Sequence, residues 1–198
     1  MASKYGHEVL VQRLIEDRNA VVSFSKNNKN AVIDSVSSYM DLLNPNNYQK
    51  GGWVLHMLRQ TMGDEKFHQS LRAFYEQYKG KNADTKDFQK VVEDISGQNL
   101  DIFFKQWLYT AGQPNLNVSW VYEEKEEKIQ IKIQQLQQTP FSFPLDITFQ
   151  LSSGKIVSTR FEVNKKEQVF TFQSKEKPID LVLDPHTALL FESVIVKE

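Results

Sequence analysis

The chain has 198 residues, of which 40% are hydrophobic and 12% aromatic, enough for one large domain or two small ones with a buried core. Its 24 basic and 25 acidic residues leave a net charge of −1, so no strong field is available to attract nucleic acid or an anionic membrane. It has no cysteine, which excludes disulfides and thiolate metal sites but leaves the compartment open between the cytoplasm and an exported location.

The N-terminal stretch, residues 4–24, has the periodicity of an amphipathic helix. No run in the chain reaches the roughly 18 apolar residues of a membrane span, and the first residues lack an apolar signal region. His7-Glu8 begins like the zinc signature His-Glu-x-x-His, but Val11 stands where the second histidine is needed, so the match is interpreted as chance. The apolar stripe of this helix is formed by Val9, Leu10, Leu14, Val21 and Val22.

A loop rich in Ser, Asn and Lys, residues 25–47, precedes the next predicted helix, 48–62. Asn46 or Asn47 can cap that helix through its side-chain oxygen. Gly51 and Gly52 are unfavourable in a helix by roughly 1 kcal/mol each relative to Ala, which predicts a close approach to the backbone or unusual dihedrals. On composition alone, Tyr48 at the mouth of the helix is a half-buried packing residue, with a phenol pointing into a cleft as the alternative.

Three further helices are predicted before the pattern changes. Gly63 is expected to end the Tyr48 helix and Asp64 to cap helix 65–79, while Asp84 or Thr85 caps the next helix and Gly97 stops it. The fourth helix spans 100–109. Because the connections are short, we expect an antiparallel helical bundle.

After Gly112 the apolar residues alternate with polar ones, which indicates half-buried strands. Six or seven strands in this part predict an immunoglobulin-like β-sandwich, and the fold class is therefore α+β in two units. We expect a helical subdomain at 1–112 and a sandwich domain at 115–196. The strands that the pattern marks are residues 117–122, 128–133, 143–149, 156–163, 169–172 and 179–184.

Few residues outside Tyr48 are candidates for chemistry. The four histidines, His7, His56, His68 and His186, have no histidine partner at helical spacing, so packed or exposed histidines are favoured over metal ligands, although His56 and His68 could converge in space. The acidic run at 123–127 is interpreted as a solvated turn between strands.

One stretch resembles a known family, the aminopeptidase N family of zinc metallopeptidases of the gluzincin type. The resemblance covers about residues 48–120 and is carried by Tyr48-x-Lys50-Gly51, Gly63-Asp64-Glu65-x-Phe67, Leu71-Arg72-x-Phe74-Tyr75, Thr85-x-Asp87-Phe88, Gly97-x-x-Leu100-x-x-Phe103-Phe104-x-Gln106-Trp107-Leu108 and Gly112-x-Pro114. It implies the C-terminal half of a thermolysin-like catalytic domain followed by a β-sandwich. It also implies that Tyr48 donates a hydrogen bond to the oxyanion of the tetrahedral intermediate. Lys50, Gly51 and Gly52 also match the family's motif, and we interpret them as structural.

The family's His-Glu-x-x-His, its third zinc ligand and its Gly-rich exopeptidase strand are absent from the sequence. The resemblance therefore implies a C-terminal fragment of a zinc-dependent aminopeptidase, as an excised piece, a truncated reading frame or a natural short form. Zinc would belong to the parent and not to this chain, and the partners would be a peptide substrate and the N-terminal half of the catalytic domain. The alternative is a non-catalytic binding or scaffold module with an exposed apolar face.

Overall fold

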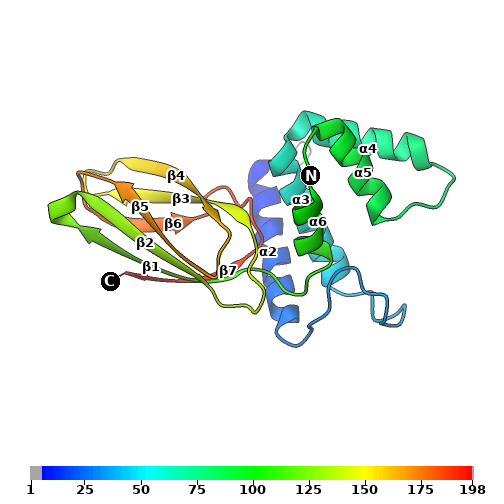
Figure 1. Cartoon of the computed structure of the whole chain (residues 1–198), viewed down its shortest axis with the longest axis horizontal. Helices are drawn as coiled ribbons and strands as arrows, with labels where there is room; N and C mark the ends of the chain where they lie inside the picture. The colour runs from blue at the N-terminus through cyan, green and yellow to red at the C-terminus, as the bar shows by residue number, and fades with distance from the viewer. Residues whose placement is uncertain (1–5, 198) are drawn as a thin grey trace. The chain divides into compact units, whose positions relative to one another are not determined.

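Residues 6–197 are described by a computed structural model of the chain (Figure 1). They form two compact units, residues 24–111 and a discontinuous unit of residues 6–23 and 112–197. The predicted fold class, a helical part plus a β-sandwich, is confirmed. The domain boundaries at 112 and 115 stay a prediction. Within the described part of the chain, no helix is both long and apolar enough to cross a bilayer.

The helical unit contains a short π-helical turn, η1 (Asn46–Lys50), and four α-helices: α3 (Gly51–Met62), α4 (Asp64–Tyr78), α5 (Thr85–Ser96) and α6 (Asp101–Leu108). Helix α3 contacts α4 and α6, and α4 contacts α5. The aromatic rings of Phe74, Phe88 and Phe104 connect α4, α5 and α6, with centroid separations of 5.2 Å and 6.3 Å. Trp53 and Leu58 of α3 are fully buried, so these apolar side chains of α3 belong to the core.

The helix ends follow the sequence at Asp84 and Gly97 and depart from it at Asp64. Asp84 accepts hydrogen bonds from the backbone N–H groups of Lys86 and Asp87, and the Asp87 carboxylate accepts from the Asp84 N–H, which makes a reciprocal capping box. Gly97 ends α5 in the left-handed conformation. The expected cap at Asp64 is wrong: its carboxylate accepts two hydrogen bonds from Arg59 instead, and Gly63 holds the cap position without a side-chain bond.

The second unit is a sandwich of a four-stranded and a three-stranded sheet, ordered β5-β2-β1-β7 and β4-β3-β6. Its strands are β1 (Asn115–Glu123), β2 (Lys128–Gln135), β3 (Phe143–Leu151), β4 (Ile156–Val163), β5 (Glu167–Gln173), β6 (Pro178–Leu183) and β7 (Glu192–Lys197). Ile129, Ile131 and Ile133 alternate with polar residues along β2 and are all fully buried. Phe149 of β3 stacks on Phe172 of β5 at 5.3 Å and so joins the two sheets.

The first helix, α2 (His7–Ser25), lies within the predicted range 4–24 except at its end, and residues 4 and 5 are outside the described residues. Leu14 and Val21 are buried as expected, but Val9 is 46% exposed and does not belong to the buried face. Up to Ser23 the helix belongs to the same compact unit as the sandwich.

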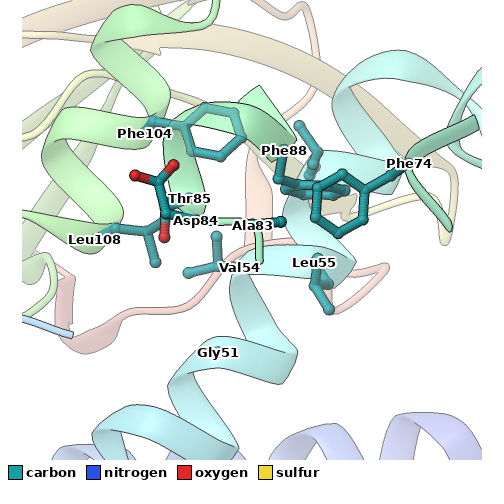
Figure 2. Close-up of a pocket in the computed structure, with 11 residues that line it drawn as sticks. Gly51, Val54, Leu55, Phe74, Ala83, Asp84, Thr85, Phe88, Phe104 and Leu108 are labelled. Carbon is teal, nitrogen blue, oxygen red and sulfur yellow. The ribbon is translucent and has the colours of Figure 1, made fainter. Parts of the chain in front are cut away.

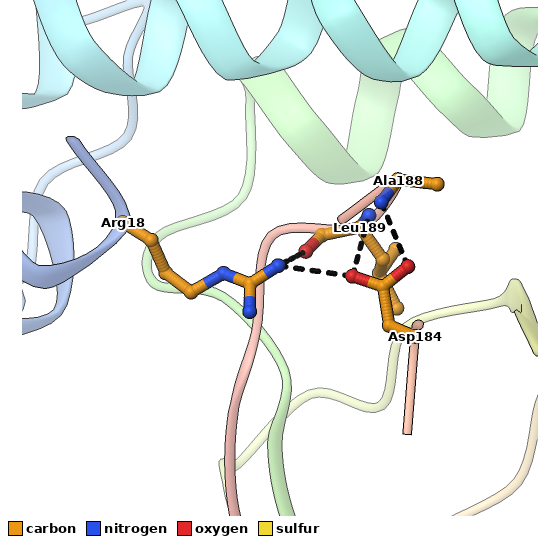
Figure 3. A network of polar contacts seen from close by, with 4 residues as sticks. All are labelled: Arg18, Asp184, Ala188 and Leu189. Carbon is orange, nitrogen blue, oxygen red and sulfur yellow. Dashed lines mark hydrogen bonds and ion pairs between the residues drawn. The ribbon is translucent and has the colours of Figure 1, made fainter. Parts of the chain in front are cut away.

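An ion pair fastens α2 to the segment between β6 and β7 (Figure 3). The Arg18 Nη2 atom donates to the Asp184 carboxylate at 2.9 Å and to the Leu189 carbonyl at 2.6 Å. The same carboxylate accepts from the backbone N–H groups of Ala188 and Leu189. Because Asp184 is buried, the three hydrogen bonds that its carboxylate accepts, from Arg18, Ala188 and Leu189, satisfy a charge that would otherwise be costly to remove from water.

Candidate functional site

The candidate catalytic residue, Tyr48, lies in the π-helical turn η1 immediately before α3. The turn is closed by the Lys50 N–H, which donates to the Pro45 carbonyl five residues earlier at 2.9 Å. The Tyr48 N–H donates to the Asn44 carbonyl at 3.2 Å, and the Tyr48 carbonyl accepts from the Gly51 N–H. Single π-helical turns of this kind are frequent at functional sites.

The side chain of Tyr48 is 63% exposed, whereas Asn46 and Lys50 on either side of it are buried. Two positions correspond to about half a helical turn, so Tyr48 points away from the face that Asn46 and Lys50 bury. Between residues 6 and 197, no hydrogen bond to the Tyr48 hydroxyl is formed. The phenol is therefore available to a ligand.

Asn46 does not cap α3, contrary to the sequence expectation, because residues 46–50 already have helical dihedrals and Lys50 occupies the cap position. Its amide Nδ2 instead donates to the Asn30 carbonyl at 3.0 Å and contacts the Asn28 Oδ1 at 3.5 Å. The Asn44 side chain makes the turn before η1 by accepting from the backbone N–H groups of Asn46 and Asn47.

Lys50 is fully buried. Burial lowers the pKa of its ammonium from 10.5 to about 8, because the charged form is disfavoured away from water. A lysine at this position is thus close to losing its proton just above neutral pH. Lys50 is interpreted from the sequence as structural, and a side chain with no exposed surface suits such a role.

The two glycines at the start of α3 do not have the environment that the sequence predicted. Gly51 has ordinary right-handed helical dihedrals, φ −56° and ψ −45°. Within residues 6–197, no atom outside the local helix lies within 4 Å of a Cβ built on Gly51 or Gly52. Neither unusual dihedrals at Gly51 nor close packing within the chain therefore explains the pair.

A hollow of about 360 Å³ opens beside α3 (Figure 2). Its lining is mostly apolar, and the Phe74, Phe88 and Phe104 rings form part of its wall. Asp84 contributes a carboxylate, but this group is committed to the capping box of α5. Tyr48 is not among the lining residues, so the hollow is separate from the candidate catalytic group.

His56 and His68, which the sequence left open as a converging pair, each contact residues of their own helix. His56 packs its edge against Trp53 in the same helix, and His68 lies against Phe67 with its Nδ1 at 2.7 Å from the Asp64 carbonyl. Among the described residues, no group of three or more His, Cys, Asp or Glu side chains could hold a metal ion. The residues present therefore do not fit a zinc site.

The candidate site contains two residues that the sequence did not assign to it, Asn44 and Asn46. The only local signal was the asparagine-rich run before the apolar helix, which is equally typical of a cap and of a loop. The partners of Asn46 lie 16 and 18 residues earlier, so no short motif could have indicated the contact.

The profile of the Peptidase family M1 domain matches residues 4–107. The chain belongs to this family. Among curated relatives, aminopeptidase N of Escherichia coli is 26% identical over 162 residues, covering 73% of this M1-family chain and 18% of that protein. Aminopeptidase N of Lactococcus lactis is 34% identical over 67 residues, covering 34% of this chain and 8% of that protein.

The fold also has a match among solved structures. The crystal structure of Legionella pneumophila aminopeptidase A in complex with aspartic acid superposes with a TM-score of 0.77 at 20% identity, covering 96% of this M1-family chain and 22% of that one. At this identity the likeness concerns the fold. The chain spans about a fifth of the length of Escherichia coli aminopeptidase N and of Legionella pneumophila aminopeptidase A.

Proposed function

We propose that this chain supplies the oxyanion-stabilising tyrosine, Tyr48, of a zinc-dependent aminopeptidase that hydrolyses N-terminal residues from peptides. In this proposal the chain corresponds to the C-terminal part of the catalytic domain and the sandwich that follows it. The observation that carries the proposal is the state of Tyr48. It lies inside the range matched by the M1 profile, it is 63% exposed, and its hydroxyl is not engaged by any other residue between 6 and 197.

The chemistry of a phenol suits the role. A tyrosine hydroxyl is an uncharged donor near neutral pH. It therefore gains most when negative charge develops on a carbonyl oxygen in the transition state, and little in the ground state. The half-turn that separates Tyr48 from the buried Asn46 and Lys50 keeps the hydroxyl on the solvent side, where a peptide carbonyl can reach it.

The described residues offer no metal site, so the chain's part in the reaction is proposed to be donor and scaffold. In the proposal, the zinc ion that polarises the scissile carbonyl is held by the N-terminal half of the catalytic domain.

The decisive test is Tyr48→Phe in a complete peptidase that includes this chain. Losing one oxyanion donor typically lowers turnover by about 10²–10³-fold, and we expect that loss in kcat with KM little changed. Tyr39→Phe is the matched control, because Tyr39 is also an exposed tyrosine of the helical unit, at 78%. Near-normal kcat in Tyr48→Phe would remove Tyr48 from the mechanism.

A second candidate function is a non-catalytic binding or scaffold module. It is favoured by the exposed apolar side chains of the segment before η1, where Val36 is 94% and Met40 70% exposed. Mixing the chain with the metal-binding half of the catalytic domain separates the two. Recovered cleavage of an aminoacyl reporter supports the peptidase, and an unchanged rate supports the binding module.

A further inference from the structure

The position of the Tyr48 hydroxyl depends on the turn that carries it. The side chain forms no hydrogen bond of its own within residues 6–197, so the hydroxyl can be no better placed than the backbone of η1. Within this turn, the Tyr48 N–H donates to the Asn44 carbonyl and the Lys50 N–H to the Pro45 carbonyl. The turn continues into α3 at Gly51, and bonds confined to one turn of helix add little stability without contacts to the rest of the protein.

Asn46 supplies such a contact. It is 5% exposed, and its Nδ2 donates to the Asn30 carbonyl at 3.0 Å and lies 3.5 Å from Asn28 Oδ1. It therefore ties the tyrosine-bearing turn to a segment 16 residues away in the sequence. Tyr48 follows two positions later, on the opposite face of η1. The Asn46 amide therefore fixes the turn on the face opposite to the phenol.

The segment that receives the amide is itself held in place. Asn28 Oδ1 accepts from the Asn30 N–H at 2.9 Å, and the Asn28 N–H donates to the Phe24 carbonyl at 3.1 Å. Asn30 Nδ2 donates to Asp34 at 2.8 Å. These bonds make residues 28–30 a fixed attachment point and not a loose loop.

We infer that Asn46 is a positioning residue for Tyr48: its buried amide fixes η1 against residues 28–30 and so sets where the phenol meets the developing oxyanion. The inference rests on the proposed function of Tyr48. Asn46 touches no substrate in this account, and its effect passes entirely through the tyrosine hydroxyl. A displacement of about 1 Å at a reacting group can cost about 10²-fold in rate.

The neighbouring Asn47 provides a matched control. It has the same side chain in the same turn, but that side chain forms no hydrogen bond with any described residue. Asn46→Asp is a second test of the donor, because it keeps the size of the side chain while facing the Asn30 carbonyl and the Asn28 Oδ1 with oxygens that cannot donate when ionised.

The experiment measures kcat and KM of a complete peptidase containing this chain, with Asn46→Ala, Asn46→Asp and Asn47→Ala each made in the wild type and in Tyr48→Phe. We expect kcat to fall about 10- to 100-fold in both Asn46 variants. In both Asn46 variants, KM should change less than about 2-fold. In the Asn47→Ala enzyme, kcat and KM should each change less than about 2-fold. In the Tyr48→Phe background the Asn46 substitutions should cost less than about 2-fold, because the hydroxyl that they misplace is gone.

An equal loss in both backgrounds would overturn the inference, since it would show a role independent of the hydroxyl. Wild-type kcat in both Asn46 variants, beside an impaired Tyr48→Phe enzyme, would also overturn it while leaving the proposed function standing. If Tyr48→Phe itself turns over normally, the proposed function fails and the inference with it. Thermal unfolding shows whether Asn46→Ala is folded, and where it is not, Asn46→Asp decides the matter.

Discussion

The buried lysine beside the candidate catalytic tyrosine is the most unusual residue of the helical unit. Lys50 is fully buried, and burial lowers its pKa from 10.5 to about 8. The unfolded chain therefore binds more protons than the folded chain between these two values. Because stability rises with pH wherever the unfolded state binds more protons, folding should become more favourable as pH increases through this window.

This sign gives a testable prediction for Lys50→Met, which keeps the length of the side chain without its charge. From about pH 7 to about pH 10, the wild type should gain up to roughly 3 kcal/mol of unfolding free energy relative to the variant. Urea unfolding of both proteins at the two pH values measures the difference. A parallel pH dependence in the two proteins would mean that Lys50 does not titrate in the folded state below its ordinary range.

At the residue level, Tyr48 and Lys50 were singled out from a short sequence pattern, and the catalytic role of Tyr48 stays a prediction. The sequence failed at Asn46, whose hydrogen-bond partners are distant in the sequence. Asn46 was expected to cap α3, and asparagine before an apolar run is a reasonable cap. The π turn places helical dihedrals before Gly51, so Asn46 falls inside a helical turn and its side chain turns to residues 28–30.

At the level of elements, local sequence patterns predicted most of the helices and strands. The alternation along 128–133 and the turn at Ser153-Gly154 gave β2 and the β3–β4 hairpin, in which the Leu151 N–H donates to the Lys155 carbonyl. Strand β7 was not predicted, because Val194-Ile195-Val196 is continuous and exposed and does not alternate. It is held by parallel pairing with β1, and no local sequence pattern indicates this pairing.

The sequence predicted a cap at the start of α5, at Asp84 or Thr85. The contribution of the Asp84 cap to stability can be measured. Asp84→Ala removes the acceptor of two backbone N–H groups, and we expect it to cost about 1 kcal/mol of stability. Asp94→Ala, near the other end of the helix, is the control, because Asp94 is exposed and its side chain makes no hydrogen bond among the described residues. Chemical denaturation compares the two, and equal midpoints would contradict the cap.

At the scale of the whole molecule, the discontinuous unit depends on the pair between Arg18 and Asp184. These residues are 166 positions apart, so their meeting could not be anticipated from spacing. Asp184→Ala would leave the Arg18 guanidinium and two backbone N–H groups without this carboxylate. Removing one partner of a buried pair typically costs about 3–5 kcal/mol.

We therefore expect Asp184→Ala to lower the stability of the chain strongly, and Asp180→Ala, on the exposed side of β6, to leave it nearly unchanged. Urea unfolding followed by tryptophan fluorescence and by far-UV circular dichroism measures both. A loss under about 1 kcal/mol for Asp184→Ala would show that the ion pair holds α2 no better than ordinary packing.

The metal content of the chain is a second prediction at this scale. The purified chain should hold no stoichiometric zinc and should cleave no aminoacyl reporter, since no cluster of ligands is present among residues 6–197. Elemental analysis after dialysis checks the first expectation. One tightly held zinc ion per chain would mean that this chain itself supplies metal ligands. The proposal that the N-terminal half of the catalytic domain holds the zinc ion would then be wrong.

The distance in sequence between Arg18 and Asp184 also bears on how the protein is made. Arg18 leaves the ribosome 166 residues ahead of its partner, which at typical rates of synthesis is a delay of roughly 10–30 s. Helix α2 must wait through that interval while residues 24–111, which form a compact unit by themselves, are translated and can fold. Helix α2 is thus exposed to chaperones throughout that interval, because it is made well before the residues that secure it.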